Sequence, residues 1–308
     1  MLAWFVGAIT TLAVAPTSLG APRPSVEPQP IIGGEDLTFD DFEEYSAVVA
    51  LVAGSSLCTG TIVEDGLVLT AAHCLLGVTD ASQIRVFNGL DVTASPSVVA
   101  NGFGGHPDFE IESNRDAFDF GYVTIPNNGL DATPIPTVTD QDEWDAIAAT
   151  LGVDGNVILV GYGIDPAVQG PGEGIGIKRL VTTRASKFTD SGFEFIAGGG
   201  GEDSCEGDSG GPAFARNADG ALRLVGITAR GSDPCGKGGF YGVPYHALAW
   251  VSEQTNRPLC GEACGACDCL DTSPAPEEGC GCTTDDDGAP LWSALLLAGL
   301  VGLRRRRR

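Results

Sequence analysis

The sequence predicts an all-β fold, either a sandwich or a barrel, built from many short strands. Short apolar runs alternate with turn residues along most of the chain, and glycine is abundant, at 44 residues. No long stretch shows a helical period, so the alternation of strands and helices that builds a parallel sheet is not expected. These observations favour a globular protein rich in strands and turns.

The expected elements follow from the positions of the apolar runs. The turn Glu64-Asp65-Gly66 joins two of the expected strands. In chain order the strands are expected at 45–52, 58–63, 67–71, 84–87, 120–125, 156–160, 222–228 and 240–243. Short helices are expected at 140–150 and 245–254.

The chain is strongly acidic, with a formal net charge of −24, although it ends in five arginines. A field of this sign repels nucleic acid and attracts cationic ligands, so we expect no nucleic-acid partner. The charge has two interpretations, solubility outside the cell and attraction of a cationic substrate.

The ten cysteines form two groups. Four are scattered through the body of the chain, and six crowd an acidic stretch near its end, at 260, 264, 267, 269, 280 and 282. Together with an apolar N-terminus, this predicts an oxidising compartment and disulfides. The C-x-x-C and C-x-C spacings of the second group also suit thiolate ligation of a metal, which stays as the alternative.

The composition divides the chain into five parts. Residues 1–21 are expected to be a secretory signal peptide, residues 22–30 a Pro-rich propeptide and residues 31–257 the folded domain. Residues 258–289 are expected to be a Cys-rich acidic linker, and residues 290–308 an apolar segment with an Arg cluster. That apolar run is short for a bilayer span, which needs about 20 residues.

Two motifs carry the chemistry. Ser209 lies within the run Gly207-Asp208-Ser209-Gly210-Gly211-Pro212, where glycines allow a sharp turn and a close approach of backbone N–H groups to a substrate. A serine nucleophile needs a base. His73 lies in the run Leu69-Thr70-Ala71-Ala72-His73-Cys74, whereas His106 and His246 have no comparable context and are interpreted as structural or surface residues.

In this order, T-A-A-H-C and G-D-S-G-G-P resemble the trypsin-like (chymotrypsin-type) serine peptidase family, and 31–34 (I-I-G-G) resemble that family's mature N-terminus. The resemblance covers about 31–257. It implies two six-stranded antiparallel β-barrels with the active site in the cleft between them, and a short C-terminal helix.

The resemblance also implies a catalytic triad of His73, Asp119 and Ser209. Asp119 fits the position of the acid before an apolar strand, and Asp116 is the competing candidate. The backbone N–H groups of Gly207 and Ser209 are expected to form the oxyanion hole. No cofactor and no metal are implied at this site.

Four further expectations come from the same resemblance. Asp208 is expected to pair with the α-amino group of Ile31 after the propeptide is cut, but Pro30 stands where the family usually has Arg or Lys. This departure predicts a different maturation protease or another exact cut. Asp203 is expected at the base of the specificity pocket, where it selects Arg or Lys, and Gly231 and Gly239 keep that pocket open. The expected disulfides are Cys58–Cys74 and Cys205–Cys235.

The chain departs from the family at the strand that binds the substrate backbone. Ala229-Arg230-Gly231 replaces Ser-Trp-Gly, which removes an apolar wall, and Arg230 is a candidate for favouring acidic groups there. The additional segment Ser232-Asp233-Pro234 before Cys235 changes the rim of the pocket.

The tail has a resemblance of its own. From Gly281-Cys282-Thr283 through Leu303 to Arg304–Arg308 it resembles the MYXO-CTERM sorting signal of myxobacterial surface proteins. This implies removal of the tail by sorting machinery and display on the cell surface, through Cys280 or Cys282.

The sequence therefore predicts an exported or surface-displayed serine endopeptidase that cleaves protein or peptide substrates after Arg or Lys. The alternative is a catalytically silent relative that acts as a binding module, although such relatives typically lose a member of the triad. A metal-binding surface protein built around the Cys-rich tail explains none of the catalytic motifs.

Overall fold

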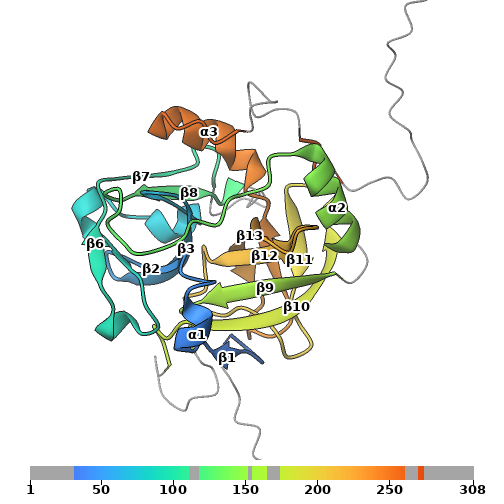
Figure 1. The fold of residues 1–308 in the computed structure, drawn as a ribbon, viewed down its shortest axis with the longest axis horizontal. Coiled ribbons are helices and arrows are strands. Elements are labelled where there is room, and N and C mark those ends of the chain that lie inside the picture. The colour runs from blue at the N-terminus through green and yellow to red at the C-terminus, as the bar shows by residue number, and fades with distance from the viewer. Residues whose placement is uncertain (1–30, 111–117, 152–154, 165–173, 261–269, 274–308) are drawn as a thin grey trace, which may run out of the picture. The chain divides into compact units, whose positions relative to one another are not determined.

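A computed structural model describes residues 31–110, 118–151, 155–164, 174–260 and 270–273 of the chain (Figure 1). The proposed signal peptide, the propeptide with Pro30, the apolar tail, the candidate acid Asp116 and most of the Cys-rich linker lie outside the described residues. None of the helices within the described ranges is both long and apolar enough to cross a membrane.

Two antiparallel sheets make up the described part of the chain. The N-terminal sheet has the order β6-β5-β2-β3-β4-β8-β7. Its strands are β2 (Val48–Ala53), β3 (Ser56–Glu64), β4 (Leu67–Thr70), β5 (Ile84–Phe87), β6 (Ser97–Val99), β7 (Gly102–Gly105) and β8 (Gly121–Thr124). Val48–Leu51 and Leu67–Leu69 are fully buried, because both faces of these central strands are covered.

The C-terminal sheet closes on itself, because β9 pairs with both β10 and β12. Its closed ring consists of β9 (Asn156–Gly161), β10 (Arg179–Phe188), β11 (Glu194–Ala197), β12 (Pro212–Arg216), β13 (Leu222–Gly231) and β14 (Gly239–Gly242). The two-residue strand β1 (Glu35–Asp36) adds to β10. Closure removes the sheet edges on which other chains could pair.

Within the described ranges, three α-helices accompany the sheets: α1 (Phe39–Phe42), α2 (Gln141–Leu151) and α3 (Tyr245–Thr255) (Figure 1). Helix α2 buries Trp144, Ile147 and Leu151, which recur at helical spacing. Residues 270–273 contact α2 and α3. Leu270 is buried and its N–H donates to the hydroxyl of Tyr245 at 3.0 Å, and the N–H of Asp271 donates to the side-chain oxygen of Gln141 at 2.7 Å.

The predicted all-β class is confirmed, and every expected strand and both expected helices are present with small shifts at their ends. The two sheets differ from each other more than expected. The C-terminal sheet is a closed barrel of six strands, whereas the N-terminal sheet is curled, with seven short strands and no closing pair in the ranges described.

Candidate active site

His73 and Asp119 meet on the N-terminal sheet. His73 lies in a 3₁₀ turn (Ala72–Leu75) directly after β4, and Asp119 lies just before β8, the neighbour of β4. One oxygen of the Asp119 carboxylate is 2.6 Å from His73 Nδ1, and the other accepts the backbone N–H of His73 at 2.9 Å. The side chain of Asp119 is only 5% exposed, against 26% for His73, so the imidazole is fixed from its buried side.

Ser209 belongs to the loop that enters β12 of the C-terminal barrel. Gly207 has φ of +94° and Gly210 has φ of +76°, a backbone region that L side chains rarely adopt. At Gly207 a Cβ atom would lie 2.8 Å from the Cα of Gly163, so this loop also requires glycine for its packing.

The loop is tied to the N-terminal sheet through Thr59 on β3. The N–H of Thr59 donates to the carbonyl of Ser209, and its hydroxyl donates to the carbonyl of Gly207, both at 2.9 Å. The disulfide Cys58–Cys74, one of the two expected, joins β3 to the turn of His73. These links bring Ser209 to the His73 side of the molecule.

Two backbone donors near Ser209 have no internal acceptor. In the described ranges, neither the N–H of Gly207 nor that of Ser209 donates a hydrogen bond, although the N–H of Asp208 between them donates to Cys205. No hydrogen bond joins Ser209 Oγ to His73 among the described atoms, and such bonds are often long in enzymes without substrate.

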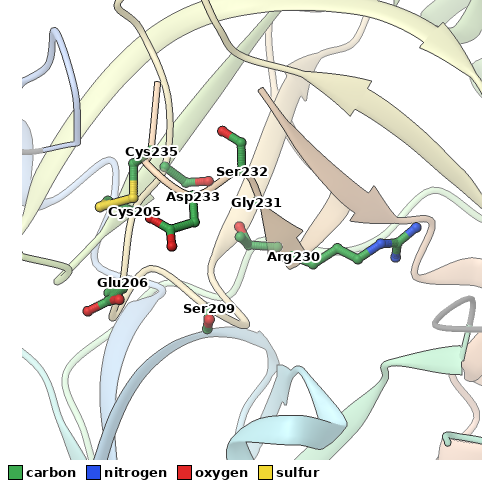
Figure 2. A pocket seen from close by; sticks show the side chains of 10 residues that line it. Cys205, Glu206, Ser209, Arg230, Gly231, Ser232, Asp233 and Cys235 are labelled. Carbon is green, nitrogen blue, oxygen red and sulfur yellow. A yellow bond between two sulfur atoms is a disulfide. The ribbon is translucent and has the colours of Figure 1, made fainter. Parts of the chain in front are cut away.

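A cavity of about 210 Å³ opens beside Ser209 (Figure 2). It is smaller than the pockets that hold drug-sized ligands and suits a single side chain. Its wall includes Ser204, the disulfide-bonded Cys205 and Cys235, and Gly231. A Cβ atom at Gly231 would meet nothing within 4 Å, so a side chain there would project into open space.

Asp203 does not line this cavity among the described residues, although the next residue, Ser204, does. It is 1% exposed, and its carboxylate accepts the N–H groups of Ser204 (2.9 Å), Gly236 (3.0 Å) and Gly238 (2.7 Å). Burial raises the pKa of Asp203, and these hydrogen bonds oppose the rise. Gly239 is buried, pairs with Gly231 between β13 and β14, and is not among the described residues that line the cavity.

Comparison with known proteins agrees with this arrangement. The family model described as Trypsin matches residues 31–251. A trypsin of Saccharopolyspora erythraea is 30% identical over 224 residues, covering 69% of this chain and 91% of that protein. A trypsin of Phaedon cochleariae is 26% identical over 258 residues, covering 79% and 96%. Snake venom serine protease 3 of Craspedocephalus gramineus is 29% identical over 237 residues, covering 67% and 79%.

The chain belongs to the trypsin family. It is a trypsin-like serine endopeptidase.

Asp208 is a second buried carboxyl group near Ser209 in this trypsin-family chain. It is 2% exposed and accepts hydrogen bonds from the N–H groups of Cys205 (2.9 Å) and Gly163 (2.8 Å). Burial raises its pKa to about 6.

The segment that starts at Ile31 runs nearby, because the N–H of Asp203 donates to the carbonyl of Ile32. While Ile31 is bonded to Pro30, its nitrogen is a neutral amide and cannot supply a cation.

Arg230 does not offer an unpaired charge to a substrate. Its guanidinium makes two hydrogen bonds to the buried carboxylate of Glu194, at 2.5 and 2.9 Å, and stacks on the ring of Phe240 at 4.0 Å from its centroid. Figure 2 shows this side chain directed away from Ser209. The hypothesis that Arg230 selects acidic substrate groups therefore loses its physical basis.

The other two histidines take part in aromatic packing. The ring of His106 stacks on Phe118 at 4.9 Å, and that of His246 stacks on Phe193 at 3.9 Å. Burial lowers the pKa of both. Cys58, His73 and Cys74 also lie together, but the two sulfur atoms are bonded to each other and are not thiolate ligands.

Sequence reasoning placed the segment of Asp233 at the pocket rim but gave its carboxylate no role, and it missed Glu206 and the role of Glu194. Glu206 directly precedes the motif that begins at Gly207, so its proximity to the pocket could have been noticed. Glu194 gave no local signal, because its partner Arg230 lies on another strand.

Proposed function

We propose that the protein hydrolyses peptide bonds after Arg or Lys through a triad of His73, Asp119 and Ser209 and an acyl-enzyme intermediate. The observation that best supports this proposal is the pair of hydrogen bonds by which buried Asp119 fixes His73. A carboxylate at Nδ1 keeps the proton there and leaves Nε2 as the base. A histidine with only a structural role has no need of this arrangement beside a nucleophile loop.

The proposed reaction has two stages. Ser209 Oγ attacks the scissile carbonyl carbon while His73 Nε2 takes the hydroxyl proton, and Asp119 stabilises the imidazolium. His73 then gives that proton to the leaving amine as the C–N bond breaks. Water, activated in the same way, attacks the acyl group, and the Ser209 oxygen leaves with the proton returned by His73.

The N–H groups of Gly207 and Ser209 are the proposed oxyanion hole. These N–H groups have no acceptor among the described residues, which supports this role, since the negative charge that develops on the carbonyl oxygen needs donors already in place. Removing one such donor typically costs about 10²–10³ in kcat.

Preference for Arg or Lys is supported by the charge around the cavity. Buried Asp203 lies directly before cavity residue Ser204, and the chain as a whole is strongly acidic. In our proposal Gly231 and Gly239 leave room for the long side chain of the substrate. Its cationic end is attracted by the carboxylate of Asp203 and by the negative charge of the chain.

The proposed life history of the protein has three parts. Export through residues 1–21 fits the disulfides Cys58–Cys74 and Cys205–Cys235, since disulfides persist in oxidising compartments. A maturation protease cuts before Ile31, and the amine so formed pairs with Asp208. Sorting machinery removes the C-terminal tail and leaves the protein on the cell surface, displayed through Cys280 or Cys282. N-terminal sequencing of the exported protein tests the cut, and a start other than Ile31 would refute it.

The experiment for specificity uses fluorogenic peptides that differ only in the residue before the scissile bond, which is Arg, Lys, Phe or Ala. In the full chain, residues 26–30 are replaced by Asp-Asp-Asp-Asp-Lys, so that enteropeptidase releases the Ile31 amine. We expect cleavage after Arg and Lys that is lost in Ser209→Ala. Cleavage only after Phe or Ala would preserve the triad and refute the specificity.

A further inference from the structure

The cavity beside Ser209 contains a carboxylate that no catalytic motif accounts for. Asp233 lies in the segment Ser232–Pro234, which is additional to the pattern of the trypsin family. It lines the cavity, and Figure 2 shows its carboxylate directed into the space between Cys205, Gly231 and Ser209.

Asp233 and Asp203 differ in exposure and in their partners. Three backbone N–H groups occupy acceptor sites of buried Asp203. Asp233 is exposed, and its carboxylate makes no hydrogen bond or ion pair with any residue that the structure describes. A carboxylate can accept about four hydrogen bonds. Asp233 therefore keeps all of its capacity for a ligand that enters the cavity.

The other charged side chains that line the cavity, Glu206 and Arg230, do not pair with the carboxylate of Asp233. Figure 2 shows Glu206 turned away from Asp233 and Arg230 extending to the opposite side. Arg230 is held there by Glu194. Among the described residues that line the cavity, none contributes a cation to Asp233.

We propose that Asp233 is a second specificity-determining residue, whose carboxylate pairs with the cationic end of the substrate side chain. This inference rests on the proposed preference for Arg and Lys. A guanidinium has five N–H donors in a rigid plane. It can therefore donate to Asp233 from one edge while its other N–H groups point toward the base of the cavity, whereas an ammonium is a compact point charge. Asp233 therefore favours Arg over Lys.

The test compares Asp233→Asn with the parent enzyme, in the full chain carrying the enteropeptidase site and on the same four peptides. The concentration of active enzyme is set by titration with a fluorophosphonate. We expect kcat/KM for the Arg peptide to fall roughly fivefold, the effect of losing one exposed ion pair. The loss is smaller for Lys and absent for Phe and Ala. Because exposed charges are screened by salt, it also shrinks in 1 M NaCl.

Asp219→Asn is the matched control, since Asp219 is exposed on the turn between β12 and β13 and its substitution changes the net charge equally. Equal kcat/KM for the Arg peptide in Asp233→Asn and Asp219→Asn would overturn the inference. A loss of equal size on all four peptides in Asp233→Asn would also overturn it. A parent enzyme without preference for Arg or Lys would instead refute the proposed specificity itself, before Asp233 is considered.

Discussion

At the residue scale, the two carboxylate oxygens of Asp119 have different hydrogen-bonding roles. One accepts the backbone N–H of His73 and fixes the position of the turn, and the other faces Nδ1 of the ring. The contact with the backbone N–H needs only a hydrogen-bond acceptor, whereas the contact with Nδ1 needs an acceptor group that cannot donate. Asparagine can meet the first requirement and fails the second.

We therefore predict that Asp119→Asn folds normally and loses about 10⁴-fold in kcat. The amide NH₂ group facing Nδ1 favours the tautomer with its proton on Nε2, which cannot act as the base. The measurement is peptide hydrolysis together with thermal unfolding. A variant that retains a tenth or more of the parent's kcat would show that Asp119 is not the acid of the triad.

At the scale of elements, three neighbouring strands of the C-terminal barrel hold Arg230. Glu194 begins β11, Phe240 lies on β14 and Arg230 itself lies on β13. The Glu194 side chain is 6% exposed and that of Arg230 is 34% exposed, so the pair is only partly screened by water. The pair fixes the strand that is expected to bind the substrate backbone.

We predict that Arg230→Ala lowers the free energy of unfolding by about 2 kcal/mol, because it leaves a buried carboxylate without its cation. Adding Glu194→Gln should recover a large part of this loss. The control is Arg216→Ala, which breaks an exposed pair with Glu44 and should cost less than about 1 kcal/mol. Urea unfolding in a Ser209→Ala background, which prevents self-digestion, measures all three. Equal losses for Arg230→Ala and Arg216→Ala would contradict this account.

The elements also show where sequence reasoning succeeds and where it fails. Strands with continuous apolar runs, such as β2 and β4, were predicted because their residues are buried on both faces. Strand β10 was missed, since its inward positions include arginine, threonine and alanine as well as valine and give a weak alternation. Strand β7 reads Gly-Phe-Gly-Gly, and β12 begins with proline, both of which indicate turns.

The site divides in the same way. His73 and Ser209 lie in local motifs that are typical of a catalytic base and a nucleophile, so the sequence alone is enough to propose these roles for them. Asp233 acquires its place only through the path of the chain between β13 and β14, and the Glu194–Arg230 pair depends on strand order. Contacts that require tertiary structure carry no local pattern that a sequence can display.

At the scale of the whole molecule, the stability of the uncut chain should report on Asp208. Its folded pKa of about 6 lies above the ordinary aspartate value of 3.8. Between these values the folded state binds more protons than the unfolded state, so this group makes stability fall as pH rises.

We predict that Asp208→Asn abolishes this fall in the uncut Ser209→Ala chain, measured by urea unfolding from pH 4 to 7. After the cut before Ile31, in chains that keep Ser209, the same substitution should abolish peptide hydrolysis, because the new amine then has no carboxylate. Full activity of the cut variant would contradict the proposed ion pair.

Lys178 provides a second test at this scale. It is fully buried between the sheets, where its ammonium donates to the carbonyl of Tyr45 and lies over the rings of Phe42 and Tyr162. Burial lowers its pKa from 10.5 to about 7. Between these values the unfolded chain binds more protons, so this lysine makes stability rise with pH.

We predict a rise from pH 7 to 9 that approaches about 1.4 kcal/mol per pH unit and disappears in Lys178→Met. Lys187→Met, at an exposed position on the adjoining strand β10, should keep it. Urea unfolding of both variants in the Ser209→Ala background checks this. The same slope in Lys178→Met and Lys187→Met would contradict the assignment.

The most direct test of the central claim, that Ser209 is a nucleophile activated by His73, is covalent labelling with a fluorophosphonate probe. The cut full-length chain is treated with the probe and digested, and the modified residue is located by mass spectrometry. We predict one label per molecule, on Ser209, which is absent in Ser209→Ala and strongly slowed in His73→Ala. A folded chain with a free Ile31 amine that remains unlabelled would contradict the account.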